Sequence, residues 1–216
     1  MHRAQHAEVV SDSVLFGSYG EDPRPAEVEI SEAARVLGFE LQHETAVPPG
    51  LRGLLEMWRK VAVNGGAFSA SFALMDVLPA AEWCLRNARL EHLDYTRRLL
   101  TSVAAIAALP DHRTDDVRMC EARFSDLRPL HLEGDLAQKL IWSGAYRPFP
   151  GTTEQAKSIA ADAAADLIGN RYDDVLISAS YDGWAPWFGS AAWDRTWIIT
   201  DTEQQTVKLI ALTDTG

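Results

Sequence analysis

The C-terminal third of the chain changes its hydrophobic period after residues 146–151, a segment with two prolines and a glycine that disfavours a helix. An alanine-rich helix capped by Thr153 is expected next, ended by Gly169 and Asn170. Strand-like runs follow at 174–181, 192–201 and 206–213, and the last two are joined by four polar residues, a length typical of a hairpin. This pattern predicts a helix packed on a three-stranded antiparallel sheet.

The middle of the chain has a helical pattern. Near the N-terminus, Ser31 is a plausible helix cap, and Phe39, Leu41 and His43 alternate with polar residues as in a half-buried strand. We therefore expect a single α+β domain over 1–216, with a possible subdomain boundary at 146–151 and a sheet that the N-terminal strands could extend. The expected helical segments are 31–37, 51–63, 67–78, 115–127 and 133–143, with a long or broken helix over 79–109. Over residues 12–30 we expect a strand or turn that leads into a surface loop.

The charge of the chain limits its partners. The 216 residues hold 20 Lys and Arg against 31 Asp and Glu, a formal net charge of -11. Nucleic acid and anionic membranes would be repelled, whereas a basic protein would be attracted. Residues 1–11 have no apolar core of a secretory signal, and the weakly polar run 99–109 is too short to span a bilayer, which needs about 20 residues. We expect a cytoplasmic protein with two reduced, packed thiols, Cys84 and Cys120.

Acidic and aromatic residues gather at the C-terminal end of the chain. Residues 151–216 carry a net charge of -6, against -5 for the first 150 residues, and four of the seven tryptophans fall within 14 residues. An apolar anchor surrounded by carboxylates suits a basic protein surface. The alternative is that these tryptophans fold back as a plug over the sheet. The candidate partner-binding residues are Asp173, Asp174, Tyr181, Asp182, Trp184, Trp187, Phe188, Trp193 and Asp194.

The tail of the chain, WFGSAAWDRTWIITDTEQQTVKLIALTDTG at 187–216, resembles the tails of small acidic bacterial proteins of the toxin-immunity type. The resemblance consists of an aromatic and acidic turn followed by a β-hairpin. It implies a compact cytosolic inhibitor that masks a toxin. Together with the charge, it leads to the hypothesis of an immunity protein or antitoxin that blocks a basic effector.

Two other functions remain open. An enzyme with a nonstandard site, with or without a metal, would use Glu91, His92, Asp94 and His131, although a solvated helix face explains these residues better because the spacing typical of metal sites in helical bundles is missing. The nucleophile, phosphate-binding and zinc motifs of common enzymes are absent, so no catalytic residue, cofactor or metal ligand is assigned. A carbohydrate or another small molecule could instead stack on the tryptophans of the loop 181–194.

Overall fold

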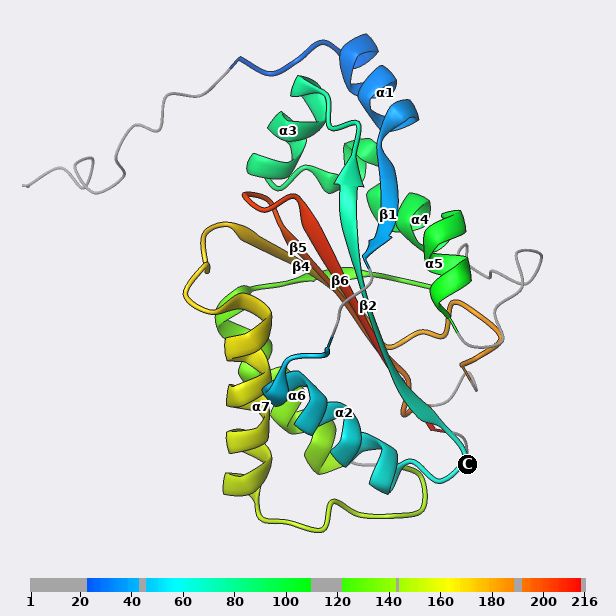
Figure 1. Cartoon of the computed structure of the whole chain (residues 1–216), viewed down its shortest axis with the longest axis vertical. Coiled ribbons are helices and arrows are strands. Elements are labelled where there is room, and N and C mark those ends of the chain that lie inside the picture. The colour runs from blue at the N-terminus through cyan, green and yellow to red at the C-terminus, as the bar shows by residue number, and fades with distance from the viewer. Residues whose placement is uncertain (1–22, 43–45, 110–121, 143, 189–191, 215–216) are drawn as a thin grey trace, which may run out of the picture.

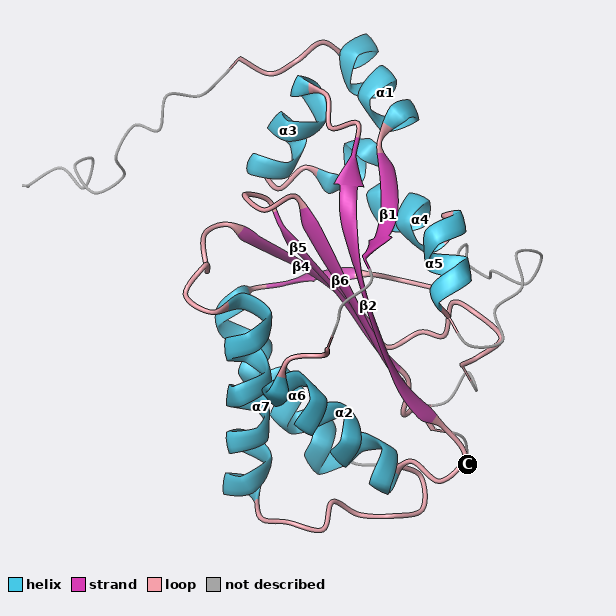
Figure 2. Cartoon of the chain, in the orientation of Figure 1, coloured by secondary structure: helices cyan, strands magenta, loops and turns pink. Residues whose placement is uncertain are grey.

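A six-stranded antiparallel sheet organises the protein (Figures 1 and 2). The computed structural model describes residues 23–42, 46–109, 122–142, 144–188 and 192–214. The fold is α+β, as predicted, but the sheet is twice as wide as the three predicted C-terminal strands. In spatial order its strands are β1 (Gly38–Gln42), β2 (Gly66–Met75), β6 (Thr206–Thr213), β5 (Arg195–Asp201), β4 (Val175–Ser180) and β3 (Ser125–Leu127).

Strands from the first half of the chain extend the predicted sheet on one side, and a short strand extends it on the other. The pairing of β2 with β6 aligns Phe72 with Val207, and β3 pairs with β4 at the opposite edge. The strand predicted from Phe39 onward is confirmed as β1. Strands that precede and follow residues 146–151 are therefore neighbours in one sheet.

Strand β2 corrects the prediction of a helix over 67–78. Alanine and serine made this segment resemble a helix, but its large apolar residues are separated by even numbers of positions, which is the period of a strand. Phe68, Phe72 and Leu74 are all buried on one face of the sheet. The helix predicted over 115–127 is also wrong where it can be compared, because Ser125–Leu127 forms β3; residues 115–121 lie outside the described part of the chain.

One face of the sheet is covered by three helices, α2 (Pro49–Val61), α6 (Leu132–Trp142) and α7 (Thr153–Ile168) (Figure 1). The cap of α7 is Thr152 and not Thr153: its hydroxyl accepts the Gln155 N–H, and the Gln155 side chain accepts the Thr152 N–H. Small side chains let α7 lie close to its neighbours, and those that are buried are Ala156, Ala160, Ala163 and Ala164.

Shorter helices cover the other face. They are α1 (Glu27–Val36), α3 (Pro79–Arg86), the 3-10 helix η1 (Leu90–Leu93), α4 (Tyr95–Leu100) and α5 (Val103–Ala108). The segment 79–109 is thus broken, with left-handed backbone at Ala88 and Asp94. Helix α1 begins before Ser31, because the Glu29 carboxylate accepts the Ala26 N–H at its start. No helix within the described ranges has the length and apolar character needed to cross a membrane.

Candidate functional site

The aromatic loop after β4 is largely a plug and not an exposed anchor. Trp184 is fully buried, and its indole N–H donates to the Thr196 hydroxyl on β5 at 3.0 Å. Phe188 is also buried, with its ring centroid 5.3 Å from that of Trp184. Half-buried Trp187 packs edge-on against Phe188 at 5.1 Å. Neither Trp184 nor Phe188 is exposed to a partner in this structure, because both rings fill the sheet face that carries the short helices.

The predicted carboxylates do not form one cluster. Asp194 is buried, and its carboxylate accepts a hydrogen bond from the Thr213 hydroxyl at 2.6 Å, so it is not available at the surface. Asp182 is exposed, and its carboxylate accepts the Arg123 N–H at 2.7 Å. Asp173 and Asp174 precede β4 whereas Asp182 follows it, and a strand of six residues spans about 20 Å. The exposed carboxylates therefore lie at opposite ends of β4.

The face covered by the long helices instead contains a buried ion pair. Arg195, at the start of β5, donates from Nε and Nη2 to the Asp135 carboxylate of α6 at 3.1 and 2.6 Å. The Trp197 indole N–H donates to the same oxygen at 2.7 Å. The side chains of Arg195 and Asp135 are only 5% and 15% exposed. Sequence reasoning missed this pair because its members are 60 residues apart and meet only when α6 crosses the sheet.

A buried lysine lies next to this pair. The Lys139 ammonium donates to the Trp193 carbonyl at 2.5 Å and lies 4.7 Å from the ring centroid of Trp58. Burial lowers the pKa of Lys139 to about 8, and the negative charge of Asp194 opposes that shift. The half-buried Trp193 therefore contributes its carbonyl to the interior, a role that its side chain type did not indicate.

Tyr181 connects the ion pair to the surface. The Arg195 guanidinium carbon stands 3.8 Å from the centroid of the Tyr181 ring, and Trp142 of α6 also lies beside that ring, with centroids 6.5 Å apart. Burial raises the pKa of the Tyr181 hydroxyl, and the positive charge of Arg195 opposes the shift. Tyr181 is 46% and Trp142 55% exposed, and the adjacent Ile141 is also exposed. We call Ile141, Trp142 and Tyr181 the aromatic surface.

The residues considered for an enzyme site do not converge. Glu91 and His92 belong to η1, which packs with α1, α3 and α4 on the short-helix face. His131 ends the 3-10 helix η3 (Pro129–His131), which packs with α6 and β4 on the other face. Asp94 pairs with Arg97. Within the described ranges, no three His, Cys, Asp or Glu side chains are grouped so that they could hold a metal.

The cysteines offer no reactive thiol in the described part of the chain. Cys84 is buried, and burial raises the pKa of its thiol, with Glu91 adding to that shift. A raised pKa keeps the sulfur protonated and therefore weakly nucleophilic. Cys120 lies outside the described residues.

Comparison with known protein families, with curated proteins and with solved structures gave no match for this chain. Among the residues first considered for binding, Tyr181 and Asp182 remain accessible beside one another, and the exposed Trp142 adjoins Tyr181. The aromatic surface is therefore the candidate functional site.

Proposed function

We propose that the protein is a cytoplasmic binding protein that recognises a basic protein partner through the aromatic surface. The observation that carries this proposal is the exposure of Trp142 at 55%, next to a Tyr181 ring that is stacked on the buried Arg195. Aromatic side chains have few rotatable bonds and lose little conformational entropy on binding. A ring that already packs on a buried side chain, as Tyr181 does on Arg195, loses even less.

The charge around this surface supports a basic partner. Asp182 follows Tyr181 directly and is exposed, and its carboxylate accepts the backbone N–H of Arg123. The cation that stacks on the Tyr181 ring, Arg195, is neutralised by Asp135. With a net charge of -11 over the chain, electrostatic attraction would accelerate encounter with a basic protein and would weaken with salt.

The specific form of this proposal is an inhibitor of the immunity or antitoxin type that masks a basic effector. Its support is the acidic charge and the resemblance of the tail. The contact residues differ from those first expected, because Trp184, Phe188 and Asp194 are buried while Tyr181 and Asp182 remain accessible. For a carbohydrate, the same burial removes Trp184 and Phe188 as stacking surfaces, whereas Trp187 and Trp193 are half-buried.

The test is affinity capture from host lysate at low and at high salt, followed by titration of the purified captured protein. The variant is Trp142→Ala, and the matched control is Tyr172→Ala, which removes an exposed aromatic at the far end of β4. We expect Trp142→Ala to weaken affinity about 30-fold, which corresponds to about 2 kcal/mol, and the control to leave it unchanged.

Two results test the binding surface and the inhibitor form of the proposal separately. Equal affinity of the wild type and Trp142→Ala would show that the aromatic surface is not the contact. A captured basic protein that keeps its own activity in the complex would rule out the inhibitor form while leaving the binding surface intact, and a captured protein that is not basic would contradict both.

A further inference from the structure

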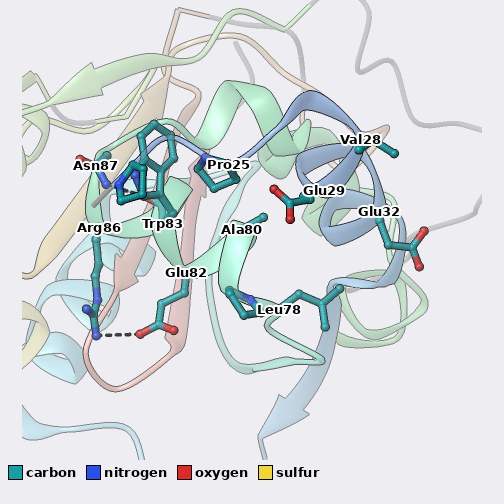
Figure 3. A pocket seen from close by; sticks show the side chains of 12 residues that line it. Pro25, Val28, Glu29, Glu32, Leu78, Ala80, Glu82, Trp83, Arg86 and Asn87 are labelled. Atoms are coloured by element: carbon teal, nitrogen blue, oxygen red, sulfur yellow. Dashed lines mark hydrogen bonds and ion pairs between the residues drawn. The ribbon is translucent and has the colours of Figure 1, made fainter. Parts of the chain in front are cut away.

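A groove lies between the first half of α1 and the length of α3, on the short-helix side of the sheet (Figure 3). Its volume is about 660 Å³, within the range of sites that hold small organic ligands. Three prolines form much of its wall, at positions 23, 25 and 79. Leu78 and Trp83 add larger apolar surface, and the buried Ala80 lies among them.

Part of the wall of this groove has little conformational freedom. Pro79 occupies the first turn of α3, where the rigid ring suits the helix, and the three rings have little conformational freedom to lose. Trp83 packs against the hydrophobic core of this face of the sheet. A ligand that packs on such a wall binds at low entropic cost.

The polar groups of the groove are mostly acidic. The carboxylates of Glu29, Glu32 and Glu82 line it, and so does the guanidinium of Arg86, which is paired with Glu82 at 2.7 Å. A helix N-terminus carries about half a positive charge and a C-terminus about half a negative one, so α1 contributes about half a charge and α3, which lines the groove at both ends, contributes little. Three carboxylates therefore exceed the positive charge at the groove by between about one and two units.

Glu29 is the carboxylate best placed for a ligand. Its Oε2 accepts the Ala26 N–H at 2.8 Å, and Oε1 has no hydrogen-bond partner among the described residues. Glu82 is engaged by Arg86, and Glu32 by Arg35 at 2.6 Å. In Figure 3, Glu29 lies by Pro25 and Ala80, whereas Val28 and Glu32 lie at the outer edge.

We propose that this groove is a binding site for a small organic cation with an apolar body, a site that goes beyond the proposed protein-binding function. The cationic group pairs with Glu29, while the apolar body packs on Leu78, Trp83 and the proline rings. Indole and carboxylate groups together favour an ammonium group. An anion of the same shape is repelled by the excess negative charge of the groove. A neutral analogue cannot form the ion pair with Glu29 and therefore binds more weakly than the cation.

The test uses three probes of matched shape: the 3-phenylpropylammonium ion, 3-phenylpropanol and 3-phenylpropanoate. Binding to the full-length protein is measured by calorimetry and ligand-observed NMR at neutral pH. We expect the cation to bind saturably with a Kd in the millimolar range or below, and the anion to bind about tenfold more weakly. Tighter binding of the anion or the alcohol, or no saturable binding of the cation at about 10 mM, overturns the proposal.

Variants locate the site without damaging the fold. Glu29→Gln keeps an oxygen for the Ala26 N–H but removes the charge, so we expect cation affinity to fall about fivefold to tenfold. Leu78→Lys places a like charge at the groove and should abolish binding. The matched control is Val103→Lys, an exposed position on α5 that does not line the groove. Retained affinity in both groove variants overturns the proposal, and so does an equal loss in the control.

Discussion

The two faces of the sheet are covered in different ways. On one face, three helices of 13, 11 and 16 residues pack side by side, and alanines on α7 let them approach closely. On the other, the helices are 4 to 10 residues long, and the rings of Trp184 and Phe188 join their core. An aromatic loop can therefore complete a core that short helices leave open, so its composition alone does not mark a binding site.

The polar groups of the two faces differ as well. The long-helix face encloses charged groups, Asp135, Lys139 and Arg195, near the start of β5. The short-helix face buries a neutral hydrogen bond from the Thr200 hydroxyl to the Tyr95 hydroxyl at 3.1 Å, and its half-buried Arg98 donates to the backbone carbonyl of Leu37 and, among the described residues, to no carboxylate. Removal of one member of a charged pair leaves an uncompensated buried charge, which costs more than the loss of a neutral bond.

The largest expected effect is the loss of stability on removing Trp184, one of the two buried rings, with Phe188, of the loop after β4. Trp184→Ala should lower the free energy of unfolding by about 4 kcal/mol, because it empties a fully buried site and leaves Thr196 without its indole donor. Urea denaturation measures this loss. Trp142→Ala, on the aromatic surface, is the control and should change stability by less than about 1 kcal/mol. Similar losses in the two variants would contradict the assignment of plug and surface.

The next effect tests the ion pair. Asp135→Ala should destabilise the protein by about 3 kcal/mol, because Arg195 stays buried without a counter-charge and Trp197 loses its acceptor. The comparison is Tyr95→Phe, which removes one neutral hydrogen bond on the other face and should cost about 1 kcal/mol. Thermal or urea unfolding of both variants decides the order, and the reverse order would refute the contrast between the faces.

A smaller effect tests the close packing of α7. Ala160→Leu should cost about 2 kcal/mol, because a larger side chain forces this fully buried position away from its neighbours. The same substitution at Ala107, exposed on α5, should leave the free energy of unfolding within about 0.5 kcal/mol of the wild type. If Ala160→Leu unfolds at the same urea concentration as the wild type, α7 does not pack against α2 and α6 as closely as described.

The smallest effect depends on pH. The pKa of Lys139 is about 8 in the folded protein, below its ordinary value of 10.5, so above pH 8 the folded state releases the proton first. At this group the unfolded state then binds more protons, so its contribution to stability rises by about 1 kcal/mol between pH 8 and pH 9, whereas the raised pKa of the Cys84 thiol contributes in the opposite direction. Urea midpoints across this range measure the slope. In Lys139→Met the slope should flatten, and a rise that persists there would assign it to another group.

Much of the fold was predictable from hydrophobic period. Strands β4, β5 and β6 and their hairpin have apolar β-branched runs, and α7 has the composition of a packed helix. Strand β2 was missed because alanine and serine between the large residues obscured the spacing of Phe68 and Phe72. Propensity is a weak guide where pairing with two neighbouring strands decides the structure.

The candidate site was predictable only in part. Tyr181 and Asp182 were identified from the acidic aromatic loop and are exposed. Trp142 was missed because a single tryptophan at the end of a helix carries no signal of exposure. Asp135 and Lys139 are spaced as a helix surface pair would be, and only the packing of α6 against Arg195 buries them. That packing depends on tertiary contacts that no local pattern encodes.

The position of β6 between β2 and β5 also determines the order in which the sheet can assemble. Phe72 of β2 can pair with Val207 of β6 only after the long segment between them has been synthesised. Until then β2 can pair with β1 alone, and its other edge stays open. Such long-range pairing slows folding and exposes apolar strands to other molecules in the meantime. In a chain that emerges from the ribosome, one edge of β2 would therefore stay unpaired until β6 has been synthesised.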